Sequence, residues 1–183
     1  MRKTKVLLAA LLSVTAVLGG VNTAHAAQSA EVMIDVKATA LDQTVVTVPG
    51  TLPVVFNEDG TNLLPSDWTI ENASSIAGIH LKKVEMDAKE SGWKLLGDSA
   101  DTKTLPVDTK SIQFYMGKAG ELKLIAPTSG TEASTGSFEF GASDISIPSG
   151  GTQLISFDIN RGAFKTAKAA AKAFDMVLTF EFN

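Results

Sequence analysis

The chain has 183 residues, with 16 Lys and Arg against 20 Asp and Glu, a formal net charge of −4 and no cysteine. This length is typical of a single domain. Proteins that hold nucleic-acid phosphates usually carry an excess of basic residues, so the acidic balance indicates no nucleic acid as a partner. The lack of cysteine excludes disulfides, cysteine nucleophiles and Cys-ligated metal sites.

Residues 1–26 have the pattern of a secretory signal peptide. Three basic residues precede an apolar run from Val6 to Gly20, and Ala24-His25-Ala26 places small residues where a signal peptidase requires them. The run of about 15 residues is shorter than the roughly 20 that span a bilayer, so we expect cleavage after Ala26 and no transmembrane span in the mature protein. Residues 27–183 would then form a single domain with 13 Lys and Arg against 20 Asp and Glu, a net charge of −7.

From Glu31 onward, short runs of alternating apolar residues are separated by turn residues such as Gly, Pro, Asn and Asp. This pattern predicts an all-β fold, an antiparallel β-sandwich in which one face of each strand is buried. The expected strands are Val32–Thr39, Val45–Val48, Leu52–Phe56, Trp68–Glu71, Ile79–Met86, Trp93–Leu96, Ser111–Met116, Glu121–Ile125, Ser137–Phe140, Asp144–Ile147, Gln153–Ile159 and Asp175–Phe182.

One short amphipathic helix is expected near the C-terminus, over Phe164–Phe174. Apolar residues recur there at helical spacing, from Phe164 through Ala167 and Ala171 to Phe174. Lys165, Lys168 and Lys172 fall on another face of that helix. A solvated helix face is the ordinary interpretation of three such lysines, and contact with an anionic polymer or phospholipid headgroups is the functional one.

Few residues of the chain could carry catalysis. His80 is the one histidine outside the signal, and strand alternation places it with Lys82 on the solvent side of Ile79–Met86. Glu85 and Asp87 share a strand face, which is more typical of a solvated edge than of a pair of glycosidase acids. The sequence lacks the GxSxG elbow, the HExxH pair and a phosphate-binding glycine loop. We therefore expect no enzyme activity and no cofactor.

The acidic loop Asn57–Asn62 offers oxygen ligands, but its spacing differs from that of an EF-hand calcium loop. A tight turn at Asp59-Gly60 explains these residues without a metal, and no metal site is expected.

Trp93 and Leu95 are the other candidate binding residues. They lie two positions apart and thus on one face of the expected strand Trp93–Leu96. Packing in the core is the ordinary interpretation, because a Trp side chain buries so much apolar area, and a ligand platform is the alternative.

Gly92-Trp93-Lys94-Leu95 resembles the first Trp-x-Leu signature of the WxL domain of Gram-positive (Firmicutes) surface proteins, over roughly residues 69–183. The final Leu178-Thr179-Phe180-Glu181-Phe182 is placed like the closing strand of that family, with Phe180 at the family's Trp, and Asp144-Ile145-Ser146-Ile147-Pro148 is similar to an intervening strand. The N-terminal part also looks like small secreted β-sandwich proteins of Firmicutes. The resemblance implies non-covalent attachment to peptidoglycan and display at the cell surface.

We therefore expect an exported, non-catalytic protein of the cell surface or cell wall, active in wall binding or adhesion. Its partners would be peptidoglycan, an anionic wall polymer or other surface proteins. The alternative is a subunit of an extracellular fibre or matrix, in which the N-terminal strand Val32–Thr39 pairs with the open sheet edge of a neighbour. An enzyme acting on wall glycans is a third possibility.

Overall fold

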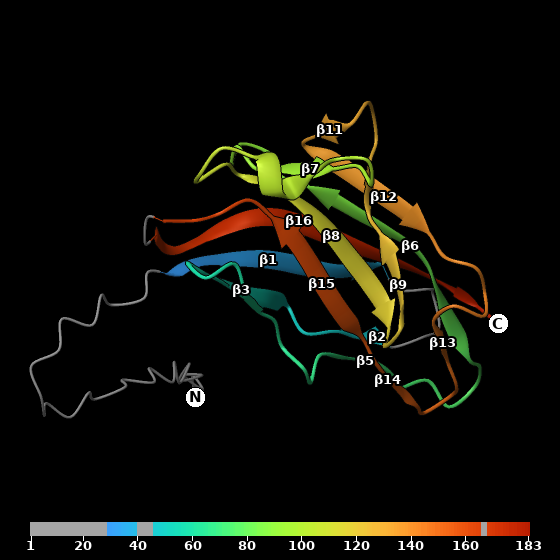
Figure 1. Ribbon diagram of the computed structural model, residues 1–183. Coiled ribbons are helices and arrows are strands. Elements are labelled where there is room, and N and C mark those ends of the chain that lie inside the picture. Colours follow the sequence, from blue (N-terminus) through green and yellow to red (C-terminus); the bar gives the residue numbers. More distant parts are fainter. Residues whose placement is uncertain (1–28, 40–45, 166–167) are drawn as a thin grey trace, which may run out of the picture.

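The computed structural model describes residues 29–39, 46–165 and 168–183, and these form an all-β structure (Figure 1). The only helix among the described residues is a single 3₁₀ turn, η1 (Thr102–Thr104). No helix in this part of the chain is long and apolar enough to cross a membrane. The expected all-β class is thus confirmed.

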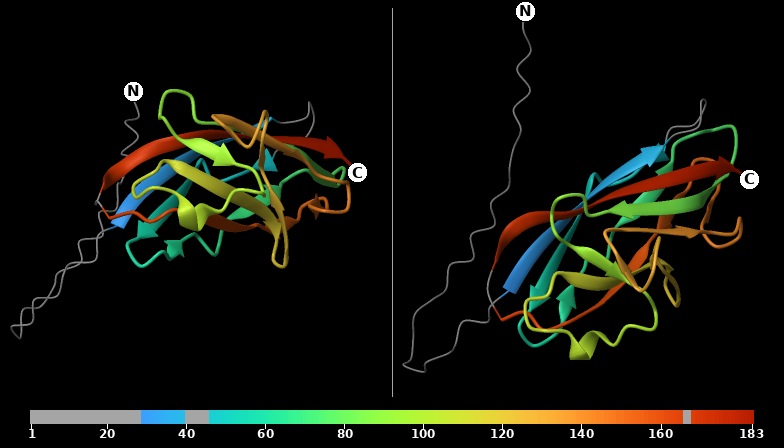
Figure 2. Two further views of the ribbon diagram at one scale, coloured as in Figure 1. Left: turned by 45° about the horizontal axis from the view of Figure 1, so that its top comes forward. Right: turned by 90° about the horizontal axis from the view of Figure 1, so that it is seen from above.

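The largest sheet has eight strands, and its central strands come from the two ends of the chain. In spatial order its members are β10 (Ala126–Pro127), β12 (Thr135–Glu139), β6 (Ile79–Asp87), β16 (Lys168–Phe182), β1 (Ser29–Thr39), β3 (Thr51–Asn57) and β4 (Asn62–Leu63), with β13 (Ser146–Ile147) also paired to β6. The long strands β1 and β16 run side by side in both views of Figure 2.

Two smaller sheets complete the fold. The five-stranded sheet contains β11 (Glu132–Ala133), β7 (Lys94–Leu96), β8 (Ser111–Lys118) and β15 (Ser156–Arg161), with β9 (Glu121–Leu124) also paired to β8. The three-stranded sheet contains β14 (Thr152–Leu154), β5 (Thr69–Asn72) and β2 (Val46–Thr47). Strand pairing is antiparallel except between β1 and β16 and between β7 and β8, so the expectation of purely antiparallel pairing was wrong at these two places.

One cluster of buried apolar side chains runs through the described chain, from Ala30 in β1 to Phe180 in β16. The alternating positions of β1 supply Val32, Ile34 and Val36, as period-two patterning requires of a strand with one buried face. The rings of Phe56, Trp93, Phe164 and Phe174 meet in one part of this core. A second ring group is formed by Trp68, Phe157 and Phe114.

The expected helix over Phe164–Phe174 is wrong. Residues 162–165 lack regular structure, residues 166 and 167 lie outside the described residues, and β16 begins at Lys168. The Ala- and Lys-rich segment pairs in parallel with β1, and two register shifts, between Ala30 and Val32 and between Met33 and Ile34, each place one extra residue on β16. Each bulge changes which side chains face the core, so a segment with the apolar spacing of a helix can still pair as a strand. Pairing with β1 therefore overrides the local helix propensity of this segment.

Other strand boundaries differ in smaller ways. The single strand expected over Gln153–Ile159 is divided between β14 and β15, which belong to different sheets. The strand expected from Val32 begins three residues earlier, at Ser29, and that expected over Asp144–Ile147 shortens to β13.

Candidate functional site

Trp93 and Leu95 both lie in the core. Trp93 is 5% exposed and Leu95 fully buried. The Trp93 ring lies 5.9 Å from the rings of Phe56 and Phe164, measured between centroids. The interpretation of these two residues as core residues is therefore confirmed.

The three lysines expected on one helix face do not form such a face, because the helix is absent. The backbone N–H of Lys165 donates to Asp108 Oδ1 at 3.0 Å, in the segment after β15. Lys168 opens β16 opposite Ala30, and its side chain lies outside the described residues. Lys172 lies on the outer face of the large sheet, where its Nζ is 2.7 Å from Asp35 Oδ2 and also pairs with Asp175.

Two of the five candidate binding residues, Trp93 and Lys172, nevertheless line one hollow of about 240 Å³. Ser91, Lys110 and the start of β1 line it as well. The segment between β6 and β7 holds this wall in place, because Ser91 Oγ donates to the carbonyl of Ala173 in β16 at 2.7 Å. Sequence patterns did not indicate this proximity, because Trp93 and Lys172 are far apart in the chain and lie in or beside strands of two different sheets.

Two further hollows adjoin the first one through shared lining residues. A second hollow of about 540 Å³ shares Ser91 and Lys172 with the first, and a third of about 340 Å³ shares Asp87, Lys89 and Asp175 with the second. We call the three together the outer groove. It crosses β1, β16, β6 and β12 and is bordered by the amines of Lys37, Lys89, Lys110 and Lys172.

Three aspartates lie side by side across β1, β16 and β6, and two of them, Asp87 and Asp175, line the outer groove. Asp175 in β16 is in register with Asp35 in β1 and with Asp87 in β6. Like charges at facing positions repel, and the burial of the Asp175 side chain, which is 9% exposed, adds a desolvation cost. Ion pairs from Lys172 and Lys89 offset both effects.

These ion pairs fix the charge states inside the groove. Lys172 and then Lys89 hold the pKa of Asp175 below its usual value, because both ammonium groups favour the carboxylate. The same contact with Asp175, followed by that with Asp35, raises the pKa of Lys172. Since Asp175 accepts no further hydrogen bond within the described structure, the two lysines provide its compensation. The groove therefore offers fixed charges of both signs to a ligand.

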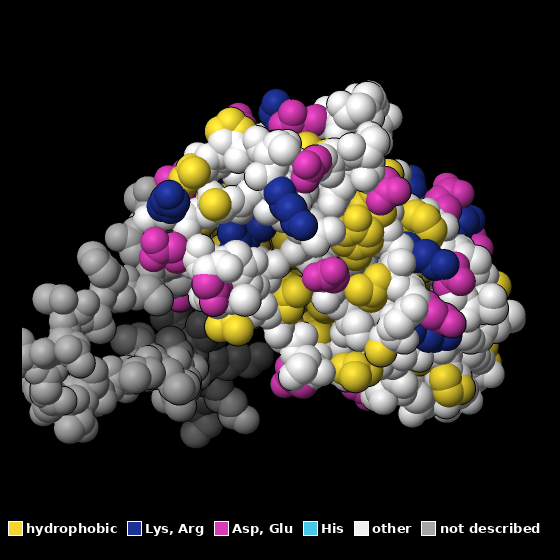
Figure 3. Space-filling model, in the orientation of Figure 1, with side chains coloured by type: hydrophobic (Ala, Val, Ile, Leu, Met, Phe, Trp, Pro, Cys, Tyr) yellow, Lys and Arg dark blue, Asp and Glu magenta, His cyan; other side chains and the backbone are white. Residues whose placement is uncertain are grey.

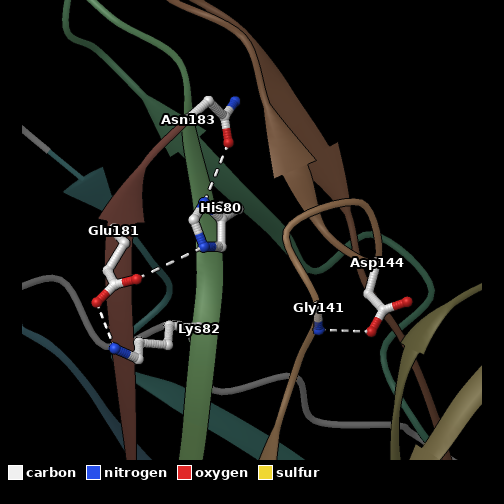
Figure 4. A network of polar contacts seen from close by, with 6 residues as sticks. All are labelled: His80, Lys82, Gly141, Asp144, Glu181 and Asn183. Carbon is white, nitrogen blue, oxygen red and sulfur yellow. Dashed lines mark hydrogen bonds and ion pairs between the residues drawn. The ribbon is translucent and has the colours of Figure 1, made fainter.

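His80 is buried, at 9% exposure, so its expected exposure to solvent was wrong. Its Nδ1 lies 3.1 Å from Asn183 Oδ1 and its Nε2 lies 3.9 Å from Glu181 Oε2, and Lys82 pairs with Glu181 as well (Figure 4). His80 is in register with Glu181 and lies on the same face of the sheet as Glu181 and Lys82, whereas Ile79 and Leu81 face the core. The network joins the beginning of β6 to the end of β16.

The two carboxylates that share a face of β6, those of Glu85 and Asp87, are engaged in contacts within the protein. Glu85 pairs with Lys83 at 2.8 Å, and Asp87 Oδ1 accepts the backbone N–H of Lys89 at 2.7 Å. They border the outer groove on β6, which is an inner strand rather than the expected edge. No cluster of three or more potential metal ligands occurs among the described residues.

Arg161 is a buried polar residue that the sequence patterns did not single out. Its guanidinium lies 4.7 Å from the Phe56 ring centroid and 5.3 Å from that of Phe164. It donates to Asn62 Oδ1 and to three backbone carbonyls at 2.7–2.9 Å, which joins the β3–β4 turn to the end of β15. Burial lowers the pKa of Arg161. From the sequence alone, a buried arginine at the end of a strand cannot be distinguished from a solvent-exposed one.

On the face of the molecule shown in Figure 3, acidic and basic side chains are interspersed and form no continuous basic area. No protein-family model matches this chain, and neither does any curated protein.

Proposed function

We propose that the chain is an exported, non-catalytic protein of the cell surface or cell wall, folded as a β-sandwich, which binds peptidoglycan or an anionic wall polymer in the outer groove. The observation that carries this proposal is the meeting of Trp93 and Lys172 in one hollow that continues into a groove bordered by four lysines.

The outer groove is lined by five carboxylates and four lysines, and two of these lysines are available for the anionic groups of a polymer. Lys37 and Lys110 have no carboxylate partner among the described residues, and the Lys110 Nζ donates only to the Ser91 carbonyl, at 2.8 Å. These two ammonium groups can therefore donate to phosphate or carboxylate oxygens without breaking an ion pair. Each exposed contact contributes only about 0–1 kcal/mol, so retention depends on several contacts along one polymer.

The chemistry of the described polar clusters also supports a binding role. Three carboxylates of the groove, those of Glu85, Asp87 and Asp175, are held by lysines or a backbone N–H group, and the ring of His80 contacts Asn183 and Glu181. A nucleophile or acid–base pair would need a free, positioned group with a strongly displaced pKa.

The test is co-sedimentation of the full chain with isolated sacculi. The variant Lys37→Gln/Lys110→Gln removes the two unpaired amines but leaves the Asp175 ion pairs intact. The matched control is Lys103→Gln/Lys123→Gln, which removes the same charge at two positions that do not line the groove. At low salt we expect the groove variant to bind several-fold less than the wild type and the control to bind normally.

Equal binding by the groove variant and the wild type would contradict the groove as the binding site. Wild-type protein that stays in the supernatant at every salt concentration would contradict wall binding altogether.

The fibre subunit is the second candidate function, and the position of β1 favours one form of it. Simple addition of the N-terminal strand to a neighbour's edge is obstructed, because β1 is already paired along both edges, to β16 and to β3. Assembly would require β1 to leave its own sheet.

A further inference from the structure

β1, the first strand of the described chain, lies inside the largest sheet and not at its edge. β1 pairs in parallel with β16, from Ala30–Lys168 to Thr39–Thr179, and antiparallel with β3, from Ser29–Asn57 to Asp35–Thr51. Figure 1 shows β1 between these two strands. Nearly the whole described chain separates β1 from β16, so this pairing joins the two most distant segments of the fold.

The apolar side chains of β1 pack into the core between β3 and β16. Ala30, Val32, Ile34 and Val36 point into the core, and none is more than 6% exposed. On the outer side, Asp35 forms an ion pair with Lys172 of β16 at 2.7 Å. A replacement strand must therefore alternate small and branched apolar residues and carry a carboxylate at one fixed position.

A second copy of this chain provides such a strand. We infer that β1 is exchanged between copies, so that β1 of one molecule occupies the place between β3 and β16 of another. Every contact of β1 in the closed molecule is recreated in the exchanged one, because the partner is identical. The free-energy difference is then confined to the connection between β1 and β2 and to the entropy of association, so protein concentration decides the outcome.

The order of folding favours exchange. The place for β1 is complete only when β16, the last strand, has paired with β6, and closing so long a loop is slow. Until then the edges of β3 and β16 are open to any β1 nearby. No disulfide can hold β1 to its own chain, since the protein has no cysteine.

Exchange has two geometrical outcomes. Reciprocal exchange closes a dimer, whereas transfer of each β1 to the next molecule builds an open fibre.

This inference rests on the proposed export, because cleavage after Ala26 would leave only two residues before Ser29.

The lack of cysteine allows a clean disulfide test. Val36 N–H donates to the carbonyl of Gly50, so in the β1–β3 ladder the outward pair Glu31 and Val55 is of the non-hydrogen-bonded type, with its side chains closest together. The variant Glu31→Cys/Val55→Cys therefore joins β1 to whichever β3 it is paired with. The control Glu85→Cys/Ser137→Cys is a pair of the same type between β6 and β12, which remain in one chain.

The full-length variants are unfolded, refolded over a range of protein concentrations, oxidised and run on non-reducing gels. We expect the β1–β3 pair to give chain-to-chain crosslinks that increase with concentration and the control to give only single chains. If the β1–β3 pair gives only single chains at every concentration, exchange is refuted. Met33→Cys/Pro53→Cys, a second outward pair of the same type in this ladder, leaves Asp35 in place and provides the test if the first variant does not fold.

A second experiment tests whether the exchange of β1 drives assembly. Monomer oxidised in dilute solution, with β1 locked to its own β3, should remain monomeric when concentrated, and reduction should restore assembly. Assembly of the locked monomer would overturn the inference. Sacculus binding of the locked monomer is measured in parallel, so that failure of strand exchange and failure of wall binding are distinguished.

Discussion

Replacement of Arg161 by Met tests the account of the core directly. Methionine keeps an unbranched apolar side chain between Phe56 and Phe164 but removes every donor. Asn62 Oδ1 and the Gly162 carbonyl then lose their Arg161 donor, whereas the carbonyls of Asn57 and Thr61 still accept the backbone N–H of Gly60 and of Asn57.

The expected loss follows from how many of these acceptors water can reach. Thr61 is exposed and Asn57 half-buried, so solvent can replace the hydrogen bonds to the turn, whereas the carbonyl of Gly162 accepts within a buried contact. Each buried acceptor left unpaired costs about 1–3 kcal/mol. Removal of the buried guanidinium recovers part of its desolvation cost. We expect the free energy of unfolding to fall by about 3 kcal/mol.

The assay is equilibrium unfolding in urea, with the denaturant slope compared between variants. Lys103→Met, at an exposed position, is the control and should change stability by less than about 0.5 kcal/mol. If Arg161→Met lost less than about 1 kcal/mol, or gained stability as some replaced buried charges do, Arg161 would not hold the β3–β4 turn against the core as described.

Three further outcomes are expected. Because the pKa of Asp175 is lowered in the folded protein, the stability from its carboxylate is complete above the unfolded value of 3.8 and is lost as the pH falls through the folded value. The free energy of unfolding measured between about pH 5 and 2 should thus fall more steeply in the wild type than in Asp175→Asn. Gly136→Ala should lose about 1–3 kcal/mol in urea, since its Cβ would lie 2.7 Å from the Ala126 carbonyl oxygen. Excess chelator should leave the melting temperature unchanged, because Asp59 Oδ1 already accepts the Thr61 N–H at 2.9 Å; a clear decrease would indicate a bound cation.

The sequence predicted the parts of the fold that depend on local alternation. Period-two patterning located the buried faces of β3 and of the second half of β16, and it placed Trp93 and Leu95 in the core. These features depend on which residues face the core, and the alternation of apolar and polar residues indicates this directly in the sequence.

The features that the patterns missed depend on pairing between distant segments. Local spacing predicted a helix before Phe174, but the parallel partner β1 draws Lys168 and the following residues into a strand. The same pairing brings Lys172 to Trp93 and places Asp175 between Asp35 and Asp87. Strand register is set by tertiary contacts, so the outer groove could not be predicted from neighbouring residues alone.

Fractionation of the source cells into medium, wall and membrane, with N-terminal sequencing of the recovered protein, tests the proposed function most directly. We expect the chain in the wall fraction, beginning at Ala27 and released by high salt, because multiple weak ionic contacts in the outer groove would retain it. Recovery of the protein only inside the cell, or only free in the medium with none on the wall, would contradict the proposal.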